Sequence, residues 1–144
     1  MVTASTIAET LGGKSVLKER LADYTAVIHR ARAGLPYAAL EAVAKRYEIP
    51  LATLARVIDL PARTLARRKK ERRLSASESD RLVRVARVTA ATEDVLDDRR
   101  KAGRWLQKPN RALGGAIPMD LLSSDLGADQ VETILGRIDY GVYS

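Results

Sequence analysis

Residues 51–70 read LATLARVIDLPARTLARRKK, and this stretch decides the fold. Its first half has the period of a short helix over residues 51–58, whose inner face carries Leu54, Ala55 and Ile58. A small residue at position 55 allows a second helix to cross close by. The first half therefore predicts one wall of a small apolar core.

The second half predicts a tight turn and a second helix over residues 62–72. Pro61 stands at the start of that helix, where its missing N–H costs nothing, and Leu65 closes the core from the other side. Asp59 occupies a turn position where many such motifs have glycine, and Asp tolerates left-handed geometry better than most residues. This is the layout of a helix-turn-helix, whose second helix lies in the major groove of DNA.

The second helix is strongly basic, with seven Lys or Arg against one acid over residues 63–73. With Leu65 inside, Arg63, Arg67 and Lys70 share the outward face, because residues four and seven apart stack along a helix. An arginine fork on that face can bond guanine O6 and N7 together. The bases expected to contact phosphates are Arg68, Lys69, Arg72 and Arg73. The alternative is a solvated face that only confers solubility.

Helical periodicity continues on both sides of this motif, without strand-like alternation of useful length. Ser75 and Glu78 have the spacing of a capping box, which starts a long helix. The expected elements are a loose leader over residues 1–14, helices over 15–33, 37–47, 51–58, 62–72 and 75–102, a short helix after Pro118 and a last helix over 129–138. The sequence therefore predicts an all-α fold in three parts: residues 1–34 as leader and helix, 35–74 as helix-turn-helix, and 75–144 as a small helical domain.

Composition narrows the function classes. The 144 residues include no Cys, no Phe and one Trp, and their formal net charge is +7. A basic excess concentrated on one helix is the footprint of a polyanion partner. The chain shows neither an apolar run long enough for a membrane span nor a secretory signal, so the expectation is a cytoplasmic protein without membrane association.

The C-terminal forty residues combine special-purpose residue types at fixed offsets. Trp105, Leu106 and Leu113 should bury a small core, and Gly114-Gly115 should supply backbone angles closed to other residues. The ending Tyr140-Gly-Val-Tyr-Ser144 carries two tyrosines, which are frequent interface anchors. The alternative is a terminal strand docked onto its own domain.

Nothing in the sequence indicates an enzyme, a metal site or a cofactor. The single histidine, His29, is next to arginines in a helix and is expected to be an ordinary surface or core residue. The acidic pairs at residues 93–94 and 97–98 are expected on one long helix, where adjacent side chains point about 100° apart. That arrangement is poor for shared acid–base chemistry.

Several motifs together resemble the MbcA/ParS/Xre antitoxin family of bacterial toxin–antitoxin modules. The resemblance covers nearly everything from Gly34 onward, and only weakly the residues before it. It rests on the sequences GLP at 34–36, RTLARR at 63–68, LS at 74–75, ESDRL at 78–82, WLQKPNRALGGAIP at 105–118 and RIDYGVY at 137–143.

The resemblance implies a type II antitoxin with two partners: a RES-domain toxin that degrades NAD, and the operator DNA of its own promoter, which it represses. It places Arg63, Thr64 and Arg67 in the recognition helix. At the toxin-facing end it places Arg137, Tyr140, Tyr143 and Ser144. Asp139 lies near that end, and we expect its carboxylate to pair with a basic pocket built for a phosphate-bearing substrate.

One helix-turn-helix covers too little operator, so a homodimer reading half-sites about 34 Å apart is expected, with the helix from Ser75 as one interface. Two other functions stay open at this point. The chain could be a stand-alone dimeric repressor without a toxin partner, or a protein-interaction module with a vestigial helix-turn-helix.

Overall fold

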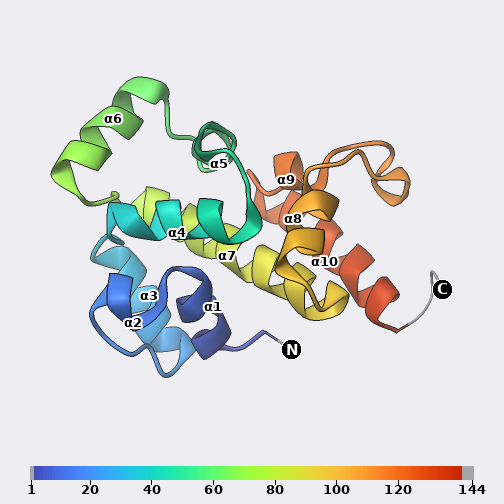
Figure 1. Ribbon diagram of the computed structural model, residues 1–144, viewed down its shortest axis with the longest axis horizontal. Coiled ribbons are helices and arrows are strands. Elements are labelled where there is room, and N and C mark those ends of the chain that lie inside the picture. Colours follow the sequence, from blue (N-terminus) through green and yellow to red (C-terminus); the bar gives the residue numbers. More distant parts are fainter. Residues whose placement is uncertain (1, 141–144) are drawn as a thin grey trace.

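The chain folds as a set of helices around one long central helix (Figure 1). The computed structural model describes residues 2–140. In chain order the elements are α1 (Ala4–Thr10), α2 (Gly13–Leu17), α3 (Tyr24–Arg32), α4 (Tyr37–Tyr47), α5 (Leu51–Val57), α6 (Ala62–Glu71), α7 (Ala76–Leu96), α8 (Arg99–Leu106), the 3-10 turn η1 (Arg111–Leu113), α9 (Pro118–Leu121) and α10 (Asp125–Asp139). Over residues 2–140 the β-type pairing is limited to an isolated bridge between Pro36 and Arg73. The all-α prediction is confirmed.

Helix α7 is the centre of the fold. The predicted capping box starts it: the Ser75 hydroxyl accepts the Glu78 N–H, and the Glu78 carboxylate accepts the Ser75 N–H. The helix packs against α1, α3, α4, α8 and α10, and Leu82, Val85 and Val88 are fully buried. Because α7 is covered on several sides, it leaves little of the free surface expected of a dimer interface.

Helix α7 ends earlier than the sequence predicts. It stops at Leu96 rather than near residue 102, because Asp97 adopts a left-handed φ of 55° and Asp98 caps a new helix by accepting the Lys101 N–H. Asp favours both roles. Gly103, which directly follows the predicted end at residue 102, lies inside α8, where a Cβ would overlap the Tyr47 carbonyl oxygen. Its small size lets α8 cross α4 at backbone contact.

The N-terminal residues also differ from the prediction. The predicted loose leader contains α1, which packs on α7; Ile7 of α1 and Leu11 at its C-cap are buried. The predicted helix over residues 15–33 is two helices, α2 and α3, because Lys18 is left-handed with φ 64° and Asp23 caps a fresh start by accepting the Ala26 N–H. Apolar residues at positions 4, 7, 8 and 11 carried a helical signal that the Gly12-Gly13 break concealed.

The remaining elements are close to the prediction. Helix α4 has the predicted bounds, and α5, α6 and α9 agree within a residue or so. Helix α10 begins at Asp125 instead of residue 129, since Ser124 caps it and Gly127 allows its first turn to touch the Leu121 carbonyl. No helix within residues 2–140 is long and apolar enough to cross a membrane.

Candidate functional site

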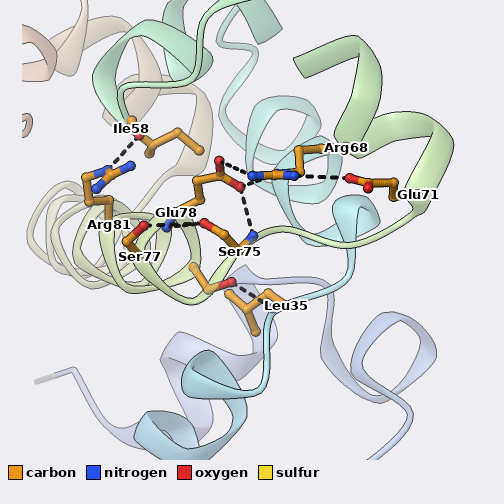
Figure 2. A network of polar contacts seen from close by, with 9 residues as sticks. Leu35, Ile58, Arg68, Glu71, Ser75, Ser77, Glu78 and Arg81 are labelled. Atoms are coloured by element: carbon orange, nitrogen blue, oxygen red, sulfur yellow. Dashed lines mark hydrogen bonds and ion pairs between the residues drawn. The ribbon is translucent and has the colours of Figure 1, made fainter. Parts of the chain in front are cut away.

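Helices α5 and α6 form the predicted helix-turn-helix. Leu54 and Ala55 of α5 and Ile58 at its C-cap are buried, and Asp59 in the turn has the left-handed φ of 57° that the sequence predicts for it. Helix α7 fixes the turn, because Arg81 donates its Nε–H to the Ile58 carbonyl at 2.7 Å (Figure 2). Helix α5 is therefore anchored in the core.

Helix α6 is held much more loosely than α5. It has no fully buried side chain, and Leu65 is only partly buried against the core. Arg63, Arg67 and Lys70 are all exposed, as the predicted recognition face requires, and Thr64 is half-buried between that face and Leu65. The helix projects from the body at the end of the molecule opposite the end of α10 (Figure 1).

Arg68 does not share the exposure of Arg63, Arg67 and Lys70. Its Nε and Nη2 donate to the two oxygens of Glu78 at 2.8 and 3.1 Å, and its Nη1 donates to Glu71 at 3.1 Å (Figure 2). The hydrogen bonds to Glu78 raise the pKa of Arg68. Burial alone would raise the pKa of Glu78, but the hydrogen bonds from Arg68 and the Ser75 N–H bring it below its usual value. The structure thus turns Arg68 toward α7 rather than toward solvent.

The predicted toxin-facing residues lie at the end of α10. Arg137 and Asp139 are exposed, and Tyr140 is 87% exposed. Tyr143 and Ser144 lie outside the described residues. Arg137 and Asp139 fall in the last turn of a helix whose inner residues are buried against α7, so this end is carried on a well-anchored support.

A mostly apolar hollow of about 430 Å³ lies beside this end of α10. Sequence reasoning missed it, because its walls come from two segments: Trp105, Pro109 and Ala112 face Ile134 and Ile138. Lys108 and Arg111 are exposed at its rim, and residues 104–111 hold three bases and no acid. The hollow, the rim bases and Tyr140 together are called the α10 end surface below. It fits an apolar side chain with a carboxylate nearby.

Comparison with known proteins assigns these two surfaces to two domain types. Residues 26–87 match the antitoxin Xre-like helix-turn-helix domain, and residues 91–141 match the antitoxin Xre/MbcA/ParS C-terminal toxin-binding domain. An "Antitoxin Xre" of Yersinia enterocolitica is 31% identical over 122 residues, covering 83% of this chain and 82% of the relative. The chain belongs to the Xre/MbcA/ParS antitoxin family.

Two further relatives match over shorter stretches. An "Antitoxin Xre" of Pseudomonas putida is 42% identical over 83 residues, which is 57% of this chain and 52% of the relative. A "Prs ADP-ribosylating antitoxin" of a Sphingobium strain is 29% identical over 80 residues, which is 49% of this chain and 50% of the relative. These are named antitoxins rather than enzymes, in agreement with the sequence prediction.

The two family matches meet inside α7, between residues 87 and 91. The antitoxin's two functional parts therefore share their central helix, and neither matched range includes α1. The three-part division at residues 34 and 74 stays a prediction.

Glu93, one of the paired acidic residues at positions 93–94, has structural partners on α4. Arg46 donates twice to Glu93 at 3.0 Å, and the buried Tyr47 hydroxyl donates to the same carboxylate at 2.8 Å, which ties α4 to α7. Burial would raise the pKa of Glu93, but Arg46 and Tyr47 lower it. No group of His or acidic residues within residues 2–140 could hold a metal ion, and His29 is exposed on α3.

Proposed function

We propose that this antitoxin belongs to a type II module, neutralises a RES-domain toxin that degrades NAD, and represses its own operon. The observation that carries the proposal is one chain that presents an exposed basic recognition helix at one end and the α10 end surface at the other. The sequence resemblance supplies the RES class. The name of the Sphingobium relative supports NAD chemistry, since ADP-ribosyl transfer also uses NAD as donor.

Neutralisation is assigned to the α10 end surface. The toxin inserts an apolar side chain into the hollow beside Trp105 and Ile138, and an adjacent carboxylate pairs with Lys108 or Arg111. Arg137, Asp139 and Tyr140, followed by Tyr143 and Ser144, then reach the NAD pocket and block it sterically. Tyr140 suits this role because an exposed tyrosine offers a large rigid contact area with a hydroxyl at its tip.

Operator binding is assigned to α6. Arg63 and Arg67 are exposed on one face and are long enough to reach base edges, and Lys70 continues that face by one turn. A homodimer would place two such helices in successive major grooves. Arg63→Ala and Arg67→Ala should each cost about 1–3 kcal/mol of binding to the operator.

The first test is co-expression with the protein encoded next to this chain. The full-length antitoxin should restore growth, restore cellular NAD and co-purify, whereas a chain cut after Ile138 should fail in all three. A harmless neighbour that does not co-purify would leave only a stand-alone repressor. Rescue with NAD still depleted would contradict occlusion of the NAD pocket.

A second test follows the hollow directly. Ala112 is exposed on its wall, so Ala112→Phe should fill the hollow without disturbing the core and should weaken toxin binding at least about tenfold, the scale of one lost interface anchor. Ala38→Phe, at an exposed alanine of α4, is the matched control.

The only tryptophan of the chain lies in the wall of the hollow, so antitoxin labelled with 5-fluorotryptophan gives one ¹⁹F resonance at Trp105. That resonance should shift when unlabelled toxin binds. A complex that forms with the resonance unmoved and with Ala112→Phe bound as tightly would remove the hollow from the interface.

A further inference from the structure

The recognition helix α6 needs something other than apolar packing to hold its orientation. None of its side chains is fully buried, and Leu65 contributes a partly buried contact. A helix that reads base edges must nevertheless be placed to well under the width of a base, because hydrogen bonds fail steeply with distance and angle. The support must come from a directional contact.

Arg68 and Glu78 make that contact, and they are called the α6 clamp here. Two parallel N–H···O bonds of 2.8 and 3.1 Å join the guanidinium to the carboxylate, and the two side chains are only 19% and 7% exposed. A two-point pair of planar groups fixes the rotation of one helix relative to the other as well as its distance. Figure 2 shows the pair bridging α6 and the start of α7.

The carboxylate is itself held in place. Glu78 is the third residue of α7, and its Oε1 accepts the Ser75 N–H at 2.8 Å as part of the capping box. The same oxygen accepts Nε–H of Arg68. The clamp is therefore mounted on the start of the central helix, which is buried among five other helices.

We propose that Arg68 and Glu78 are positioning residues for operator recognition: they fix α6 so that Arg63 and Arg67 meet the bases, and Arg68 itself contacts no phosphate. This inference rests on the proposed operator binding. It replaces the sequence-based assignment of Arg68 to the DNA backbone.

For the Glu78→Gln variant, the clamp predicts a change in operator affinity opposite to the one that simple electrostatics predicts. Glu78→Gln removes a negative charge from a DNA-binding region, which would strengthen binding to a polyanion if charge alone mattered. Because the clamp is weakened, operator affinity should instead fall, by about tenfold on the scale of a charge-assisted hydrogen bond. Glutamine keeps an amide oxygen for the Ser75 N–H, so the helix cap is largely preserved.

Salt dependence separates positioning from phosphate contact. A plot of log affinity against log salt concentration has a negative slope, and loss of a phosphate-binding arginine reduces the magnitude of that slope by about one. Arg68→Ala should reduce affinity for the promoter fragment while leaving that slope unchanged, and it should reduce affinity for operator more than for random DNA. Arg72→Ala, at an exposed base in the same segment, is the comparison expected to lower the slope.

Ser75→Ala controls for helix stability. It removes the other half of the capping box but leaves both clamp residues, so it should lower the melting temperature without reducing operator affinity. The exchanged pair Arg68→Glu with Glu78→Arg should recover part of the affinity that either single change loses.

The outcomes are distinct. Tighter operator binding by Glu78→Gln, or a slope lowered by one in Arg68→Ala, would overturn the clamp and leave operator binding intact. If Ser75→Ala and Glu78→Gln lose equal amounts of operator affinity, the Arg68–Glu78 pair is an ordinary stabilising contact and the positioning proposal is overturned. A wild-type chain that binds its promoter no better than random DNA would overturn operator recognition first, and the clamp with it.

Discussion

Helices α6 and α10, which carry the two proposed interaction surfaces, are supported in opposite ways. Helix α10 buries Val131, Ile134 and Leu135, among others, against the body, so apolar packing holds it along its length. Helix α6 buries none of its side chains fully and depends on Leu65 and the α6 clamp. The proposed toxin-binding end is thus built on the core, whereas the proposed DNA-reading helix is attached to the core by few contacts. Changes to the core should therefore damage α10 first, and changes to single polar contacts should damage α6.

The largest expected effect comes from removing apolar volume under α10. Leu135→Ala should lower the free energy of unfolding by about 3 kcal/mol, because Leu135 is 2% exposed and its loss leaves a cavity. Leu65→Ala in α6, where the leucine is only partly buried, should cost about 1 kcal/mol. Urea denaturation of both variants measures the difference. Similar losses would show that α6 is packed as firmly as α10.

Alanine substitutions at two glycines of α10 should give the next largest effect, and they should change the stability of the fold in opposite directions. A Cβ at Gly127 would overlap the Leu121 carbonyl oxygen, so Gly127→Ala should destabilise the fold by about 2 kcal/mol. Gly136 has no neighbouring atoms around its Cβ position, so Gly136→Ala should stabilise by about 0.5–1 kcal/mol through helix propensity. Thermal unfolding measures both. Stabilisation by both changes would mean that α9 and α10 do not touch as described.

Acidification should give the smallest global effect and should act mainly on polar attachments. The pKa of Glu78 and the pKa of Glu93 are both lower in the folded chain than the ordinary value of 4.5. A carboxylate with a lowered pKa stabilises the fold fully above its unfolded pKa and ceases to do so as pH falls through the folded value. Stability should therefore be level near neutral pH and decline below 4.5.

Two measurements check this pH dependence. The decline should be shallower in the Glu78→Gln, Glu93→Gln double variant. Amide exchange, corrected for its intrinsic pH dependence, should accelerate in α6 more than in α10. Equal acceleration in both helices would contradict the difference in their support.

The sequence predicted what depends on local signals. Ser75 and Glu78 specified a capping box, and Pro61 marked the start of α6, because both signals act within a few residues. It failed where the deciding partner is distant. Gly103 resembles a helix terminator until Tyr47 is seen packed on it, and helix α1 needs the surface of α7 to bury its apolar face.

The same reason limited the prediction of the sites. Arg63, Arg67 and Lys70 could be placed on an outward face because helical periodicity settles which residues point away from Leu65. Arg68 is an equally basic neighbour, and only the fold shows that Glu78 occupies its guanidinium. The hollow beside Trp105 was not predictable, since its two walls are about thirty residues apart in the sequence.

The shared helix α7 has a consequence for anyone who recombines members of this family. A chimera joined between the two matched domains, at residues 88–90, would splice two sequences in the middle of a buried helix whose faces contact both halves. The exposed break at Asp97–Asp98 is the better crossover point, because it lies between helices and leaves α7 from a single parent. Because α8 and α10 both pack on α7, a transplanted α8 to α10 should keep its fold only when the two parents carry similar side chains on the α7 faces that it contacts.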